Sequence, residues 1–116
     1  MRVVWLGALA ILSGISPTSA QNQNFGLGVN SCAEFARNYA ASPQLIEDAY
    51  FVWATGFMSG LNLDAIAFGR PHRIFNPTDT ATYKLLIRSY CDAHPLVAYA
   101  QAVAVLYKGL PVANSN

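Results

Sequence analysis

Residues Ala49–Leu63, AYFVWATGFMSGLNL, decide the fold, because these fifteen consecutive residues carry no charge. The stretch is longer than a typical buried strand and shorter than the roughly 20 residues of a membrane span. Two glycines four residues apart, Gly56 and Gly60, lie near its centre. The stretch is therefore predicted to form a buried central helix that other helices approach.

Ser42-Pro43 is the start signal for this helix, since a capping residue followed by proline is typical of a first helical turn. Apolar residues then recur at spacings of three and four, at Leu45, Ala49, Val52, Trp53, Gly56, Phe57 and Gly60. Trp53 is expected in the core, and Gly56 and Gly60 are expected where a neighbouring helix packs closely. The alternative is that Gly60 ends the helix early.

Three further helices are predicted around it, so the fold class is all-α with about four helices in one domain. The first begins at Ser31, where Ser31-Cys32-Ala33-Glu34 fits a capping box. The third begins at Pro77 with Asn76 as its cap, and places Arg88 and Asp92 as an exposed pair one turn apart. The fourth covers Leu96 to Lys108 after Pro95. The domain spans residues 31–110, between a flexible arm at 21–30 and a flexible tail at 111–116.

The connection at residues 63–76 is the least regular part of the sequence. Gly69-Arg70-Pro71-His72 is a plausible turn between two apolar segments, which would make a small irregular hairpin. An extended loop lying over the core fits the same residues equally well. Both conformations stay open at this point.

The first twenty residues resemble a secretory signal peptide in their organisation. Arg2 precedes an apolar segment, and Thr18-Ser19-Ala20 supplies small residues before a cleavage site. Cleavage is predicted after Ala20, which places the protein in the periplasm or outside the cell. An uncleaved N-terminal anchor is the alternative, although the apolar segment is short for a span.

The two cysteines, Cys32 and Cys91, are predicted to form a disulfide. An even number of cysteines in an exported small domain is typical of a covalent link that supplements a small core. The apolar spacing of Cys32, Phe35 and Tyr39 turns the first cysteine inward. No neighbouring residues stand at the spacing of metal ligands, so no metal site is expected.

Charge and motifs argue against several classes of function. Removal of Arg2 leaves six basic and six acidic residues, so no nucleic-acid partner is expected. His72 and His94 are the only histidines, and neither belongs to a nucleophile, metal or phosphate-binding motif. We therefore expect no enzyme activity and no cofactor, and interpret His94 as a cap of the last helix.

The residues after the central helix are the candidate partner-binding surface: Phe68, Arg70, His72, Arg73 and Phe75, with Ile74 among them. Arginine and aromatic residues dominate the binding energy of protein interfaces. The alternative is that the apolar members pack into the core while the arginines are solvated. Homodimerisation also stays open, because the central helix has more apolar surface than three short helices can cover.

Three motifs together resemble a known group of small exported bacterial proteins. They are Ser31-Cys32 with Phe35, the segment Gly56-Phe57-Met58-Ser59-Gly60, and Tyr90-Cys91-Asp92-Ala93-His94-Pro95 leading to a helix with Gln101. The chain is similar in these to the Rap/Tai immunity proteins of type VI secretion amidase effectors. Their disulfide-linked helical fold is itself similar to that of HdeA-type periplasmic acid chaperones. The resemblance covers about Ser31 to Tyr107 and does not extend to the 63–76 connection.

This resemblance implies a protein that binds another protein. Resemblance to the immunity proteins implies that the partner is a periplasmic toxin, which the chain neutralises. Resemblance to the acid chaperones implies that the partner is an unfolded client protein, which binds after acid opens the fold. The disulfide would then hold the opened chain together.

Overall fold

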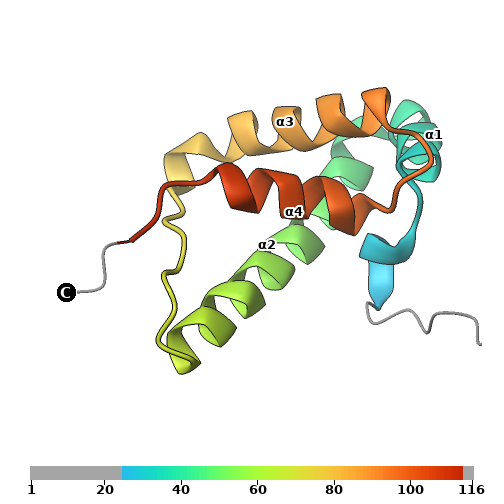
Figure 1. The fold of residues 1–116 in the computed structure, drawn as a ribbon. Coiled ribbons are helices and arrows are strands. Elements are labelled where there is room, and N and C mark those ends of the chain that lie inside the picture. Colours follow the sequence, from blue (N-terminus) through green and yellow to red (C-terminus); the bar gives the residue numbers. More distant parts are fainter. Residues whose placement is uncertain (1–24, 114–116) are drawn as a thin grey trace, which may run out of the picture.

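The computed structural model describes residues 25–113, and within them it confirms an all-α single domain with four α helices and no strand (Figure 1). The predicted signal peptide and residues 21–24 of the predicted arm lie outside this part of the chain. The elements are η1 (Gly26–Val29), α1 (Cys32–Ala41), α2 (Pro43–Ala67), η2 (Pro77–Asp79), α3 (Thr80–Ala93) and α4 (Tyr99–Gly109), where η marks a 3-10 helix.

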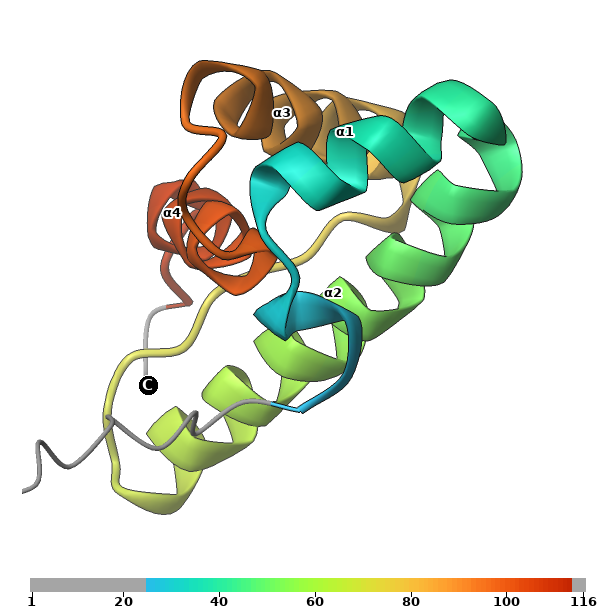
Figure 2. The ribbon, with the colours of Figure 1, turned by 90° about the vertical axis from the view of Figure 1, so that its right-hand side faces the viewer.

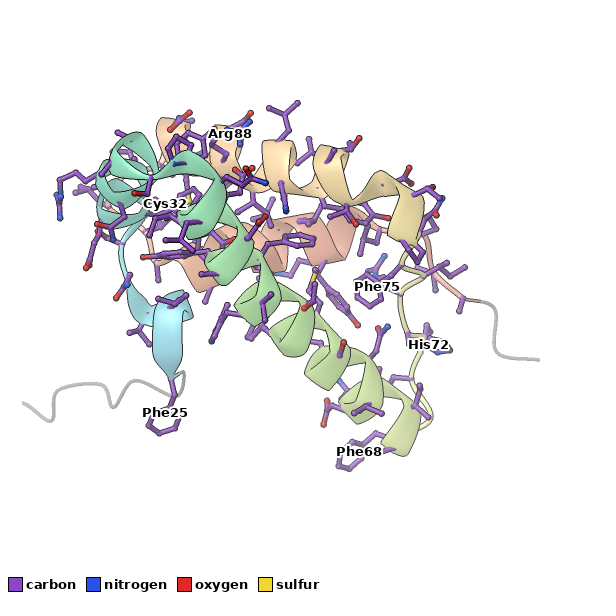
Figure 3. The ribbon with its side chains drawn as sticks, turned by 180° about the vertical axis from the view of Figure 1, so that it is seen from behind. Phe25, Cys32, Phe68, His72, Phe75 and Arg88 are labelled. Atoms are coloured by element: carbon purple, nitrogen blue, oxygen red, sulfur yellow. A yellow bond between two sulfur atoms is a disulfide. The ribbon has the colours of Figure 1, made fainter. Side chains whose placement is uncertain are left out.

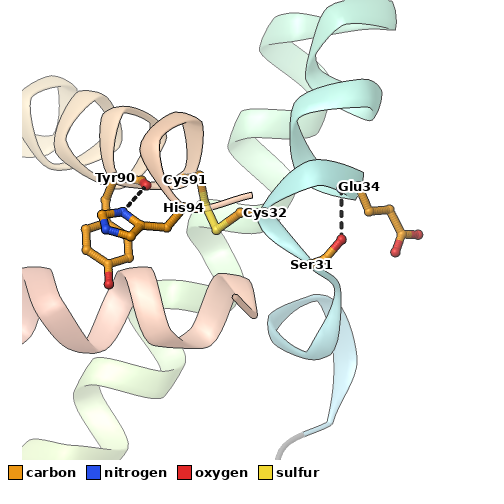
Figure 4. The surroundings of a disulfide bond; sticks show 6 residues. All are labelled: Ser31, Cys32, Glu34, Tyr90, Cys91 and His94. Carbon is orange, nitrogen blue, oxygen red and sulfur yellow. Dashed lines mark hydrogen bonds between the residues drawn. A yellow bond between two sulfur atoms is a disulfide. The ribbon is translucent and has the colours of Figure 1, made fainter. Parts of the chain in front are cut away.

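Local capping signals give the starts of α1, α2 and η2 correctly. The Ser31 hydroxyl accepts a hydrogen bond from the backbone N–H of Glu34 at 3.1 Å. The Glu34 side chain points away from Ser31, so only this half of the predicted capping box is formed (Figure 4). Pro43 is the first residue of α2, and the Asn76 side chain caps η2 by accepting from the Thr78 N–H.

The disulfide between Cys32 and Cys91 is present, as predicted, and links the start of α1 to the end of α3 (Figure 4). Both cysteines are buried together with Phe35, and Tyr39 is half-buried on the same face of α1. The rings of Phe35, Tyr50 and Tyr99 pack around this link, with centroids about 5 Å apart. The covalent link therefore lies in the aromatic part of the core.

Helix α2 turns a different face to the core from the predicted one. Its buried side chains are Tyr50, Phe51, Ala54, Met58 and Ala65. Of the predicted face, Trp53 and Phe57 are half-buried against the core, whereas Leu45 and Val52 are exposed to solvent. Because α2 is apolar on both sides, residue spacing alone does not select the face. The buried side carries two aromatic rings and a methionine, and its burial removes more apolar surface from water.

The glycines of α2 do not receive a neighbouring helix, so the predicted close packing at Gly56 and Gly60 is wrong. A Cβ added to either glycine meets no neighbouring atom within 4 Å. A close approach occurs instead at Gly28, where an added Cβ would lie 2.0 Å from the Trp53 ring. Trp53 is a packing residue, half-buried against the core. It packs on η1 and, edge to face, against the Tyr99 ring at the start of α4, with centroids 6.2 Å apart.

The predicted flexible arm is ordered from residue 25 onwards. The Trp53 indole donates a hydrogen bond to the Phe25 carbonyl at 2.7 Å. The Asn30 side chain donates to the Tyr50 hydroxyl, and the Asn30 carbonyl accepts from the Tyr99 N–H, both at 2.8 Å. These contacts join η1 to α2 and α4. They could not be predicted from the sequence, because residues 21–30 are polar and show no helical periodicity.

Helix α2 continues to Ala67, which excludes the predicted hairpin because Ala65 to Ala67 are helical. The connection is an irregular loop at residues 68–76 that runs back beside the C-terminal segment (Figure 1). Ile74 N–H donates to the Pro111 carbonyl, and Ala113 N–H donates to the His72 carbonyl, both at 2.8 Å. These bonds join residues 111–113 of the predicted flexible tail to the loop, whereas residues 114–116 lie outside the described part of the chain.

Helix α4 begins at Tyr99, three residues later than predicted, and Leu96 is 93% exposed on the preceding turn. The Tyr99 N–H donates to Asn30 instead of to Pro95. The Pro95 and Val97 carbonyls accept from the first amides of α1 at 2.9 and 2.8 Å. Tertiary hydrogen bonds therefore hold residues 94–98 in a turn.

Figures 1 and 2 show α1, α3 and α4 gathered on one side of α2, whose C-terminal half projects away from them. The loop at residues 68–76 returns from the end of this projecting half to the body of the molecule. The candidate partner-binding residues thus lie between the free end of α2 and α4.

Candidate protein-binding surface at the end of helix α2

The five predicted partner-binding residues divide into two groups in the structure. Phe68 and Arg70 lie at the free end of α2 and are exposed, whereas Arg73 and Phe75 are half-buried along the returning loop. In Figure 3, Phe68 points away from the body of the protein, while Phe75 points toward it. His72 lies between the two groups and is half-buried.

Arg73 is held inside the protein by three hydrogen bonds. Asn62 on α2 accepts from the Arg73 N–H at 2.9 Å and donates to the Arg73 carbonyl at 2.8 Å. The Arg73 guanidinium donates to the Leu110 carbonyl at 2.9 Å. Its charged group is thus directed to the end of α4, which is not the solvent-facing position expected of a partner contact. A guanidinium at the C-terminal end of a helix also faces the negative end of the helix dipole.

Asn62 is a positioning residue that sequence reasoning did not identify. Its carbonyl oxygen also accepts a hydrogen bond from the Tyr107 hydroxyl at 2.7 Å. One amide on α2 therefore holds both the loop and α4. An asparagine inside the uncharged stretch at residues 49–63 was the only signal in the sequence, and it does not by itself indicate which backbone groups the amide meets.

Phe75 packs against the core, with its ring centroid 6.4 Å from that of Tyr107. The next residue, Asn76, donates its N–H to the Tyr83 hydroxyl at 3.1 Å. The alternative that was left open in the sequence, an aromatic side chain packed into the core, therefore holds for Phe75. His72 contributes its backbone carbonyl to the contact with Ala113.

Phe68 and Arg70 form the exposed part of the surface. Phe68 caps the C-terminal end of α2 and is 74% exposed. The Arg70 guanidinium lies 5.6 Å from the centroid of the Phe68 ring, within the range of a cation–π contact, and forms an ion pair with Asp64. We call Phe68 and Arg70 the α2 tip.

The α2 tip is fixed by a tight turn. Gly69 adopts a positive φ of 65°, a conformation that glycine reaches without strain. The Arg70 N–H donates to the Ala65 carbonyl at 2.7 Å, and the Gly69 N–H donates to the Ile66 carbonyl at 3.1 Å. These bonds close the last turn of α2. The Phe68 ring and the Arg70 guanidinium therefore lie on a folded turn. The hydrogen bonds between Asn62 and the Arg73 backbone hold the loop that follows this turn.

Beside the α2 tip lies a shallow hollow of about 470 Å³ whose walls come from α2, the loop and α4. Its lining includes Asp64, Arg70, Arg73 and Tyr107. A partner side chain entering it would meet hydrogen-bonding groups on one side and the Tyr107 ring on the other. The hollow adds a recess to the exposed surface of the tip.

A different set of charges joins α2 to α3. Glu47 pairs with Arg88, and Asp48 pairs with Lys84 at 2.6 Å. The Arg88 guanidinium donates a hydrogen bond to the Glu47 carboxylate, and this bond raises the pKa of Arg88. Arg88 also lies 4.9 Å from the Tyr39 ring centroid. The predicted partner of Arg88, Asp92, is thus replaced by a residue of another helix.

His94 does act as a cap, but of the helix before it. Its Nδ1 lies 2.9 Å from the Tyr90 carbonyl, and its ring stacks on the Tyr90 ring at 4.0 Å (Figure 4). The contact is at the C-terminal end of α3, and not at the start of α4 as predicted. Tyr90 and His94 line one end of an open hollow of about 590 Å³ between α3 and α4.

Comparison with family models, with curated proteins and with solved structures finds no match for this chain. The resemblance to immunity proteins and acid chaperones therefore stays a prediction from its motifs. Within residues 25–113, no helix has both the length and the apolar character needed to cross a membrane.

Proposed function

We propose that this chain is an exported, non-catalytic module that binds another protein through the α2 tip. The observation that carries the proposal is the exposed Phe68 ring with the Arg70 guanidinium beside it, on a turn that internal hydrogen bonds hold in place. Aromatic residues and arginines supply most of the energy of protein interfaces when they enter a partner's pocket. A preformed turn also reduces the entropy lost on binding.

The partner best suited to this surface is a protein with an apolar recess bordered by acidic or carbonyl groups. Phe68 would fill the recess, and Arg70 would exchange its solvent-exposed pair with Asp64 for a contact across the interface. Exposed ion pairs contribute little to stability, so this exchange has a low energetic cost. The motif resemblance suggests a periplasmic toxin as the partner, and the disulfide is compatible with export.

Protection of cells tests this function directly. A toxin encoded by a neighbouring reading frame would be directed to the periplasm with the full-length chain, and cell survival would be measured. Survival is expected with the wild-type chain and is expected to be lost with the double variant Phe68→Ala and Arg70→Ala. Leu96→Ala is the matched control, because Leu96 is more exposed than Phe68 but lies on the distant turn between α3 and α4. Equal protection by all three chains would contradict a role for the tip.

The ion pairs between α2 and α3 support a second candidate, the acid-activated chaperone. At about pH 2 to 3 carboxylates are protonated, so Glu47 and Asp48 would no longer pair with Arg88 and Lys84. The N-terminal part of α2 would then separate more easily from α3, while the disulfide still joins α1 to α3.

Suppression of client aggregation distinguishes this candidate. The chaperone function requires suppression by the wild-type chain near pH 2 to 3 and none at neutral pH. The double variant Glu47→Gln and Asp48→Asn should then suppress aggregation at a higher pH than the wild type. Absence of suppression at every pH would remove the second candidate and leave the first unaffected.

A further inference from the structure

One whole face of α2 is apolar and uncovered. We call it the α2 stripe, and it consists of Leu45, Ala49, Val52, Gly56, Gly60, Leu63 and Ala67. All seven residues are exposed, and the three large ones, Leu45, Val52 and Leu63, are 69–71% exposed. Because each residue turns an α helix by about 100°, the stripe lies on the side of α2 opposite the buried Ala54, Met58 and Ala65.

The stripe is larger than a few scattered apolar residues. It runs along a helix of 25 residues, which is about 37 Å long. Contiguous apolar surface of this extent on a soluble protein marks an interaction site. The two glycines at its centre weaken the helix relative to alanine, and no contact within the described monomer requires them.

We propose that the α2 stripe binds the same stripe of a second copy of this chain, with the two helices antiparallel and a two-fold axis at Gly56. In this register, residue numbers that face each other add up to 112. The register places a small residue opposite every large one: Leu45 faces Ala67, Val52 faces Gly60, Leu63 faces Ala49, and Gly56 faces Gly56. A two-fold interface requires such self-complementarity, because each copy offers the same patch.

The complementarity explains the positions of the glycines. At the axis the two Gly56 residues face each other without side chains, so the helix backbones can approach closely there. Gly60 makes room for Val52 of the partner copy. Large and small side chains that alternate across facing helices fill the space between them without voids.

The charges beside the stripe do not oppose pairing. Asp48 is paired with Lys84, and Asp64 is paired with Arg70, so both flanking carboxylates are already neutralised within each copy. Asp64 lies roughly 80° around the helix from Gly56, since each residue turns an α helix by about 100°. Because Arg70 pairs with Asp64 on this side of the helix, and not on the stripe, the α2 tip remains accessible in the dimer.

The extent of the stripe sets the expected affinity. The stripe runs from Leu45 to Ala67, so the contact is about 33 Å long and about 10 Å wide and covers on the order of 660 Å² over both copies. This is below the roughly 1,200–2,000 Å² of standard stable interfaces. We therefore expect a reversible dimer with a dissociation constant on the order of micromolar or weaker.

Sedimentation of the full mature chain, with Gly56→Ala beside it, tests the proposal. The wild type should change from monomer to dimer between about 1 µM and 1 mM. Gly56→Ala should raise the dissociation constant roughly tenfold, because two methyl groups would meet at the axis. The variant monomer should keep its urea midpoint or raise it, since the added Cβ meets no atom in the monomer. A wild type that stays monomeric throughout would overturn the proposal, as would a variant that dimerises as well as the wild type.

Cysteine cross-linking tests the register. Gly56→Cys should form an intermolecular disulfide on mild oxidation, because the two residues face each other at the axis. Leu63→Cys should not cross-link to itself, since its two copies lie about 21 Å apart along the helices. A mixture of Leu63→Cys and Ala49→Cys should cross-link. Efficient self-linking of Leu63→Cys, or its absence in Gly56→Cys, would overturn this register. The double variant of Phe68 and Arg70 should dimerise normally, which separates this test from the proposed function.

Discussion

At the scale of single residues, Gly28 has the most restricted environment in the described chain. The Trp53 ring occupies the space that a Cβ on Gly28 would need. Overpacking of this kind typically destabilises a protein by about 1–3 kcal/mol. Gly28→Ala is therefore expected to lower the free energy of unfolding by that amount, measured by urea denaturation at a concentration where the chain is monomeric.

Gly60→Ala is the matched control for this substitution. An added Cβ on Gly60 meets no neighbouring atom, and alanine favours the helix by about 1 kcal/mol over glycine. The control should be neutral or stabilising in the monomer. A Gly28→Ala variant as stable as the wild type would show that η1 does not pack on Trp53 in solution.

The Tyr99 hydroxyl predicts a dependence of stability on alkaline pH. Burial raises the pKa of Tyr99 above its ordinary value, and the charge of Glu47 adds to this effect. Above about pH 10, an unfolded tyrosine loses its proton while the folded Tyr99 keeps it. The unfolded state then becomes relatively more favourable, so stability is complete below pH 10 and falls as the pH rises further.

Tyr99→Phe removes this titration and should reduce the loss of stability between about pH 9 and pH 11. The measurement is the urea midpoint of both proteins at each pH. Tyr90→Phe is the control, because Tyr90 is only half-buried and its substitution should leave the alkaline loss in place. An identical alkaline loss in Tyr99→Phe and wild type would contradict the assignment.

At the scale of elements, the amide of Asn62 joins α2, the loop and α4. Asn62→Ala removes its bonds to the Arg73 backbone and to the Tyr107 hydroxyl. Leaving half-buried polar groups without partners costs about 1–3 kcal/mol of unfolding free energy. The variant should also exchange the Arg73 and Ala113 amide hydrogens faster than the wild type.

Hydrogen exchange measured residue by residue checks this prediction, with Gln101→Ala as the control. Gln101 is an exposed amide on α4, so its loss should leave exchange in the loop unchanged. If the exchange of Arg73 does not respond to Asn62→Ala, the amide does not anchor the loop.

The element starts were predictable from the sequence because their causes are local. Ser31, Pro43 and Asn76 act on backbone groups within three residues, so the sequence around each contains the whole signal. The buried face of α2 was not predictable in the same way. Both faces of α2 are apolar, so the face that becomes buried depends on the side chains of η1, α1 and α4 that pack against it.

The candidate site was predictable only in part for the same reason. The loop composition drew attention to Phe68 and Arg70, which the structure shows to be exposed, but it did not separate them from the half-buried Arg73 and Phe75. Arg73 points inward because Leu110 lies opposite it, 37 positions away in the sequence. His94 was identified as a cap, yet its capped carbonyl belongs to the preceding helix. Contacts between distant segments decide each of these cases.

At the scale of the whole molecule, the two surfaces for which we propose binding roles lie on different parts of α2. The disulfide and the aromatic core join α1, α3 and α4 on one side of α2. The opposite face of α2 carries the stripe, and its free end carries the tip. A domain with this arrangement could bind a partner at the tip and a second copy along the stripe without competition between the two.

The most direct test of the account is the affinity of the purified chain for a toxin encoded by its neighbouring reading frame, measured by titration calorimetry. We expect Phe68→Ala to weaken binding by at least 2 kcal/mol, about 30-fold, because an aromatic anchor at the centre of an interface contributes on this scale. Leu96→Ala should bind as tightly as the wild type. Equal affinity of Phe68→Ala and wild type for a toxin that both bind would contradict the central claim that the α2 tip is the binding surface.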